Sequence, residues 1–128
     1  MRLLLDTHIL LWAVGVSYRL PAEVSAVLQD ARNQIYFSSA SIWEIAIKQS
    51  RARKDFDFQP EQIAAAALAS RFVELPVRWE AASAVARLPI HHRDPFDRIL
   101  VAQAMTEPLT LYTADRRLGL YSDLVHLI

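Results

Sequence analysis

Short apolar runs recur along the chain, and longer segments with a different period separate them. The first run, Arg2–Leu5, ends in three consecutive leucines, which favours a strand buried on both faces. Ile35–Phe37 is β-branched and aromatic, which favours a second strand. On this basis we predict strands over residues 2–5, 35–37, 72–75, 109–113 and 124–128.

The segments between these strands have the spacing of helices. Val24, Val27 and Leu28 fall on one helical face, and Pro21 suits a first turn. We predict helices over residues 9–14, 21–30, 41–49, 62–70, 79–88 and 95–105. Strands that alternate with helices predict an α/β fold, with a central parallel sheet of about four or five strands and helices on both faces.

Length and composition add limits to this picture. The chain has 128 residues, and we expect residues 1–128 to form one domain. The 14 basic and 14 acidic residues give a formal net charge of zero, so any binding of nucleic acid must rely on a local patch or on bound metal. There is no cysteine, which excludes disulfides, thiolate zinc sites and cysteine nucleophiles. Only two glycines occur, which excludes a glycine-rich phosphate loop.

The first apolar run does not resemble a targeting segment. Asp6 and His8 interrupt it too early for a signal peptide. No stretch approaches the roughly 18 apolar residues of a membrane span. We therefore expect a cytoplasmic protein without a membrane segment.

Four carboxylates lie near predicted strand ends or helix starts. Asp6 directly follows the first strand, and Asp115 comes two residues after the strand that ends at position 113. Glu44 and Asp97 are predicted in the first turns of helices. Because ligands of parallel sheets bind beyond the carboxyl ends of the strands, we expect one edge of the sheet to collect all four acids.

Such a cluster predicts a metal site. Carboxylates that repel one another destabilise the fold, and a hard divalent cation such as Mg²⁺ or Mn²⁺ removes that cost. The bound ion can activate water and stabilise charge on a phosphate. The acids therefore point to metal-assisted hydrolysis of a phosphodiester.

Helix capping offers a second explanation for the same acids. Ser41 and Glu44 match a capping box, and Asp94 precedes a proline at a helix start. Asp6 and Asp115 can each cap the segment that follows them. Each acid alone fits capping as well as catalysis, and it is their joint placement that favours the metal site.

Four segments in fixed order carry a resemblance to a known family. They read LLLDTHILLW from residue 3, SSASIWEIAIK from residue 38, HHRDPFDRILVAQA from residue 91 and LYTADR from residue 111. The chain resembles the PIN domain from Met1 to about Ile128, and more narrowly the VapC-type toxins of bacterial toxin–antitoxin pairs.

This resemblance implies an α/β fold and a Mg²⁺- or Mn²⁺-dependent ribonuclease. The four acids of the family match Asp6, Glu44, Asp97 and Asp115, and all four are expected to be both catalytic and metal-binding. A small hydroxyl residue beside the acids matches Thr7 or Thr113. Asp94 is interpreted as a helix cap, or as a group that supports the metal ligands without binding the ion itself.

The resemblance also implies partners. A growth-inhibiting toxin of this kind acts on RNA, forms a homodimer and is held inactive by a small antitoxin protein. The antitoxin would occupy an apolar helical groove, for which Ile9, Leu10, Ile42 and Trp43 are candidates.

Basic and aromatic residues add weaker expectations. A solvated helix end is the simplest interpretation of the cations after residue 45, and phosphate contact is the alternative. The candidates for RNA contact are Lys48, Arg51, Arg53, Lys54, Arg93, Arg98 and Arg116. His91 and His92 are expected in a surface loop or against RNA, and Trp12, Trp43 and Trp79 in the core or in an interface.

Two other functions remain open at this point. A phosphatase with Asp6 as nucleophile normally has a second aspartate two residues on, where this chain has His8. A non-catalytic RNA- or protein-binding module would use the acids only as caps. We expect instead that water attacks the phosphorus in line and that the products are a 5′-phosphate and a 3′-hydroxyl.

Overall fold

A sheet of parallel strands forms the centre of the protein in a computed structural model, which describes residues 1–15, 19–51 and 57–128. Within these residues the sheet has five strands in the order β3-β2-β1-β4-β5. Their bounds are β1 (Arg2–Leu5), β2 (Gln34–Ser38), β3 (Val73–Leu75), β4 (Thr110–Thr113) and β5 (Val125–Leu127). The predicted parallel sheet is therefore confirmed.

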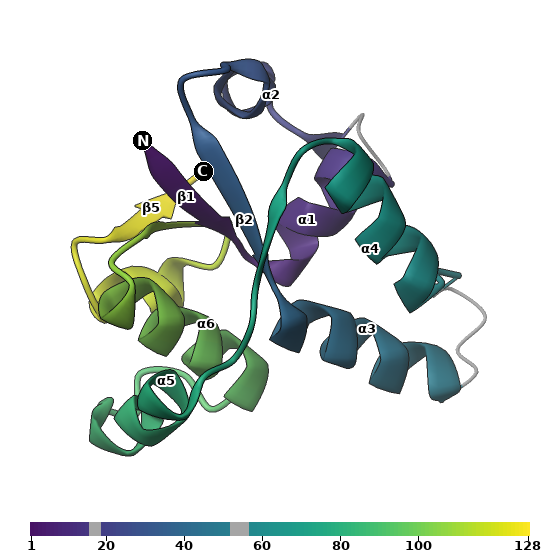
Figure 1. Ribbon diagram of the computed structural model, residues 1–128. Coiled ribbons are helices and arrows are strands. Elements are labelled where there is room, and N and C mark those ends of the chain that lie inside the picture. Colours follow the sequence, from purple (N-terminus) through teal and green to yellow (C-terminus); the bar gives the residue numbers. More distant parts are fainter. Residues whose placement is uncertain (16–18, 52–56) are drawn as a thin grey trace.

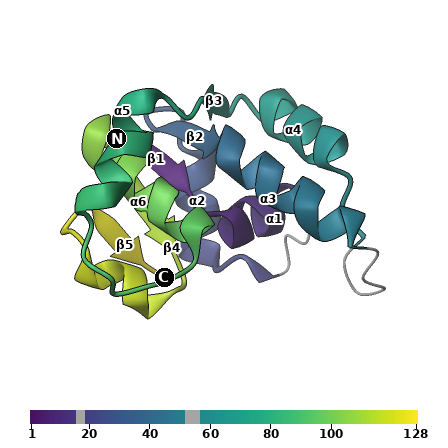
Figure 2. The same ribbon diagram turned by 90° about the horizontal axis from the view of Figure 1, so that it is seen from below.

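Helices cover both faces of this sheet, as predicted (Figure 1). The bounds of the α-helices are α1 (Thr7–Val14), α2 (Ala22–Gln29), α3 (Ser39–Ser50), α4 (Pro60–Ala69), α5 (Trp79–Ala84) and α6 (Pro95–Thr106). Among the described residues there are also the short 3₁₀ helices η2 (Val85–Arg87) and η3 (Arg116–Leu120). Figure 2 shows α5 beside α6 at one side of the molecule, with α1 and α4 at the other.

Alternation along the strands produces two cores. Leu3 and Leu5 point to one face, where they pack with Ile9 and Leu10 of α1. Leu4 points to the opposite face and packs against α6 and η3. Both faces of β1 are buried, which explains why its apolar run is continuous.

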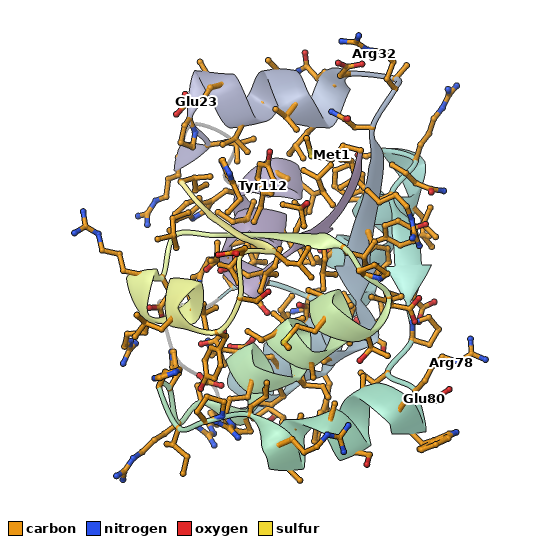
Figure 3. All side chains as sticks on the ribbon, turned by 90° about the vertical axis from the view of Figure 1, so that its left-hand side faces the viewer. Met1, Glu23, Arg32, Arg78, Glu80 and Tyr112 are labelled. Atoms are coloured by element: carbon orange, nitrogen blue, oxygen red, sulfur yellow. The ribbon has the colours of Figure 1, made fainter. Side chains whose placement is uncertain are left out.

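Several charged side chains lie at the surface, whereas the side chain of Tyr112 lies in the core. In Figure 3, Arg32, Arg78 and Glu80 lie at the periphery, whereas Tyr112 of β4 lies inside. Tyr112 is buried in the first core, and its ring stacks on His126 with 4.5 Å between centroids.

The structure changes the expectation for the antitoxin groove. Ile9 and Leu10 are fully buried in the core, so a groove cannot use them. Ile42 is partly buried, and Trp43 is 64% exposed. Trp79 is 76% exposed, so Trp43 and Trp79 are not core residues, and only the interface half of that expectation remains for them.

Two helix boundaries differ from the predicted ones. Helix α3 starts before Ser41, because the Ser38 hydroxyl at the end of β2 already accepts the Ala40 N–H at 3.0 Å. The capping box of Ser41 and Glu44 is therefore wrong. The helix predicted over 79–88 is α5 followed by η2, and it ends before Pro89.

Residue Arg71 follows the end of α4 and has a left-handed backbone with φ of 67°. This conformation turns the chain toward β3, and the N–H of Phe72 donates to the Ala67 carbonyl at 2.9 Å. Glycine is the residue that usually occupies such a position.

Helix length bears on the membrane question. The longest helices, α3 and α6, have 12 residues each. Among the described residues, no helix is long and apolar enough to cross a bilayer.

Candidate active site

The carboxyl ends of β1 and β4 lie side by side at the middle of the sheet. The chain passes from β1 to β2 on one side, while β4 pairs with β1 on the other. This is the switch point at which parallel sheets bind ligands. The N–H of Asp6 donates to the Tyr112 carbonyl at 3.0 Å, which extends the pairing to the residue that follows β1.

Asp6 is the most deeply buried acid here, together with Glu44, and each residue is 4% exposed. One oxygen of Asp6 caps α1 by accepting the Ile9 N–H at 2.8 Å, and the other accepts the Thr113 hydroxyl. Burial raises the pKa of Asp6, and the nearby charge of Glu44 adds to the rise, although both hydrogen bonds oppose it.

Thr113 connects Asp6 to Asp115. Its hydroxyl donates to Asp6 and accepts the Asp115 N–H at 3.0 Å. Asp115 caps η3 through the Arg117 N–H at 3.0 Å. Burial raises the pKa of Asp115, but hydrogen bonds from Arg117 and His92 outweigh it and lower the pKa to about 2.

Asp97 lies in the first turn of α6, which Asp94 caps through the Phe96 N–H at 2.8 Å. Burial raises the pKa of Asp97 to about 7, and the charges of Asp94, Asp6 and Glu44 act in the same direction while His92 opposes them. The capping role of Asp94 agrees with the sequence, and its charge also acts on Asp97.

His92 lies between two of the acids, contrary to the expected surface loop. The residue is buried, and its Nε2 lies 2.9 Å from Asp115 Oδ2 and 3.1 Å from Asp97 Oδ2. Ligand atoms of the three residues fall within 4.8 Å of one another. Two adjacent histidines look alike in the sequence, and only the packing of the loop decides which one faces inward.

Glu44 lies in the second turn of α3 rather than the first. Its Oε2 pairs with Lys48 Nζ at 2.8 Å. Its Oε1 is buried and has no hydrogen-bond partner among the described residues. Capping accounts for Asp6 and Asp115, but it does not account for Glu44.

The donors fit a hard divalent cation. A buried carboxylate oxygen without a partner is costly, and so is an aspartate whose pKa reaches about 7. A cation held by Asp6, Glu44, Asp97 and Asp115 would remove both costs, because Mg²⁺ and Mn²⁺ prefer oxygen ligands.

Thr7 and Arg98, two other predicted residues, bond to groups other than the acids. The Thr7 hydroxyl donates to Ser41 Oγ at 2.9 Å rather than to an acid. Arg98 donates to the carbonyls of Val85 and Pro89 at 3.0 and 2.9 Å, so main chain occupies its guanidinium. Arg53 and Lys54 lie outside the described residues.

A shallow hollow beside the acids carries several of the predicted cations. Lys48, Arg51 and Arg93 line it together with Glu44 and Asp94. Arg93 and Arg116 are exposed. Cations thus border the acidic cluster on the surface although the whole chain is neutral.

These features define a class of protein: a parallel α/β domain that gathers acidic side chains at the carboxyl ends of its central strands. The chain belongs to the PIN domain family, whose sequence model matches residues 3–124. This confirms the family predicted from the four motifs. Among curated proteins, none matches the chain at a significant level.

Solved structures share the fold. VapBC2 from Rickettsia felis, bound to a DNA fragment from their promoter, gives a TM-score of 0.68 at 18% identity and covers 100% of this chain and 98% of that chain. VapBC-1 from nontypeable Haemophilus influenzae gives 0.62 at 17% identity, with 99% and 98% covered. FitAcB from Neisseria gonorrhoeae gives 0.60 at 17% identity, with 98% and 96% covered.

Proposed function

We propose that the protein is a Mg²⁺- or Mn²⁺-dependent endoribonuclease whose catalytic acids are Asp6, Glu44, Asp97 and Asp115. The observation that carries this proposal is the acid cluster, in which buried Glu44 keeps an oxygen without a partner among the described residues and the pKa of partly buried Asp97 is raised to about 7. Membership of the PIN domain family supports nuclease chemistry at such a cluster.

The chain's own residues prepare the cluster for a cation. Thr113 and the Ile9 N–H fix both oxygens of Asp6 in place before anything binds. Glu44 keeps Oε1 free of partners within the described part of the chain. The bound cation would act as a Lewis acid that lowers the pKa of a water and offsets charge on the phosphate.

We assign substrate contact to the cations that border the cluster. Lys48, Arg51, Arg93 and Arg116 would hold phosphates on either side of the bond that is cut. Arg98 is left out because backbone carbonyls bind its guanidinium. Water adds to phosphorus, the bond to the 3′ oxygen breaks, and that oxygen takes up a proton. The products are a 5′-phosphate and a 3′-hydroxyl.

In the cell we propose a cytoplasmic, VapC-type toxin that forms a homodimer and is restrained by an antitoxin protein. The likeness to the VapBC and FitAcB structures supports this role, together with the sequence resemblance. Induced expression in a bacterial host should slow growth for wild type and not for Asp97→Asn.

Cleavage of a mixed cellular RNA pool tests the chemistry. Purified wild type should cut RNA in Mn²⁺ and not in EDTA, and Asp97→Asn should lose the activity. Glu80→Gln is the matched control, because Glu80 is an exposed acid on α5. This variant should cleave RNA as wild type does. Cleavage in EDTA, or full cleavage by Asp97→Asn, would refute the proposal.

A further inference from the structure

We propose that His92 is a positioning residue of the acid cluster: its Nε2–H holds the carboxylates of Asp115 and Asp97, and its ring is not a ligand of the cation. The inference rests on the cation site proposed above and does not depend on RNA cleavage. Distance alone would allow the opposite role, because His92, Asp97 and Asp115 lie close enough to share one ion.

The tautomer of His92 follows from its other nitrogen. Nδ1 lies 3.0 Å from the Asp94 nitrogen, whose N–H can only donate. Nδ1 must therefore present a lone pair, and the proton of the neutral ring is at Nε2. That N–H donates to Asp115 Oδ2 at 2.9 Å and faces Asp97 Oδ2 at 3.1 Å.

A nitrogen that carries a proton has no lone pair for a cation. To become a ligand, Nε2 would have to give up its proton to Nδ1. Nδ1–H would then face the Asp94 N–H, with two donors 3.0 Å apart. The backbone at Asp94 therefore keeps His92 as a donor to carboxylates.

Tyr121 and Arg98 fix the loop that carries this histidine. The Tyr121 hydroxyl accepts the N–H groups of His91 and His92 at 3.1 and 2.9 Å. Arg98 donates to the same hydroxyl at 3.1 Å and to the Pro89 carbonyl at 2.9 Å.

These two residues belong to the segments that carry the acids. Tyr121 caps the end of η3, whose first cap is Asp115. Arg98 follows Asp97 on α6. Asp115 and Asp97 are therefore each connected to the His92 loop in two ways. The imidazole contacts the carboxylate, and a residue of the same helical segment, Tyr121 or Arg98, bonds the loop. This arrangement sets the spacing of the two carboxylates.

The tautomer can be observed directly. Protein with ¹⁵N-labelled histidine is compared by NMR at pH 8, without metal and saturated with Mg²⁺, and His92→Gln assigns the signals. We expect a protonated Nε2 and an unprotonated Nδ1 in both states. Loss of the Nε2 proton when Mg²⁺ binds would overturn the inference.

The positioning role is tested by Tyr121→Phe, which removes a hydroxyl that bonds the His92 backbone and, among the described residues, no carboxylate. We expect Mn²⁺ affinity, measured by calorimetry, to fall about tenfold, the lower end of such effects. Tyr36→Phe is the matched control, because its hydroxyl bonds Gln34 at 2.8 Å far from the acids, and its affinity should stay unchanged.

Melting in EDTA verifies that both variants are folded. Unchanged Mn²⁺ affinity in folded Tyr121→Phe would refute the positioning role. If Tyr121→Phe shows the tenfold loss of Mn²⁺ affinity but wild type cleaves no RNA, the proposed function is refuted and this inference stands.

Discussion

The substitution Asp97→Asn should stabilise the metal-free protein above neutral pH. In the folded chain the pKa of Asp97 is raised from 3.8 to about 7, mainly by burial and by the charge of Asp94. The folded state therefore binds the proton more tightly than the unfolded state. It follows that the contribution of Asp97 to stability is fully present below pH 3.8 and is lost as the pH rises through 7.

The size of the effect can be estimated from this shift. A pKa that rises from 3.8 to about 7 corresponds to a loss of about 4 kcal/mol once Asp97 is ionised, at roughly 1.4 kcal/mol for each tenfold change in proton affinity. The side chain is 21% exposed, so solvent screens it only in part. Asparagine also loses the attraction of a charge to the helix N-terminus, at most about 1 kcal/mol. We expect a net gain of about 3 kcal/mol at pH 8.

Urea denaturation in EDTA at pH 4.5 and pH 8 measures this gain. Asp97→Asn should exceed wild type by about 3 kcal/mol at pH 8, and most of the difference should vanish at pH 4.5, where wild type takes up the proton. Glu80→Gln should follow wild type at both pH values, because Glu80 is exposed. An Asp97→Asn variant no more stable than wild type at pH 8 would contradict the assigned cause.

Two further predictions concern single hydrogen bonds and a single dihedral angle. Thr113→Val keeps the shape of a fully buried side chain but removes the hydroxyl that bonds Asp6 Oδ2 and the Asp115 N–H. The free energy of unfolding in urea should therefore fall by about 1–3 kcal/mol, whereas Thr113→Ser should retain it. Arg71→Gly relieves the left-handed backbone after α4 and should raise the melting temperature by a few degrees, whereas a lower value would show that the arginine side chain matters there.

The fold class and most of the positions of the acids in the fold could be predicted from the sequence alone. Three leucines in a row before Asp6 predict a strand buried on both faces, and its carboxyl end must then carry the aspartate. The helical spacing between such strands leaves a parallel sheet as the simplest arrangement. The spacing of apolar residues and the end of a strand at which an acid lies are local properties, and local properties can be read from one sequence.

Helix starts were harder to place. Ser38, Ser39 and Ser41 can all cap a helix, and the spacing of Ser41 and Glu44 favoured the wrong one. Ser38 at the end of β2 is the cap, because its hydroxyl accepts the Ala40 N–H and donates to the side chain of Gln103 on α6. That choice moves Glu44 one turn into the helix, where capping no longer accounts for it.

Which side chains lose contact with water depends on the tertiary structure. Ile9 and Trp43 look alike as apolar helix residues, yet one is in the core and the other is on the surface. His91 and His92 are neighbours in the chain, yet only His92 is buried against the acids. Burial depends on contacts between segments far apart in the sequence. The raised pKa of Asp97, the unpaired oxygen of Glu44 and the tautomer of His92 all follow from such contacts, so no local pattern contains them.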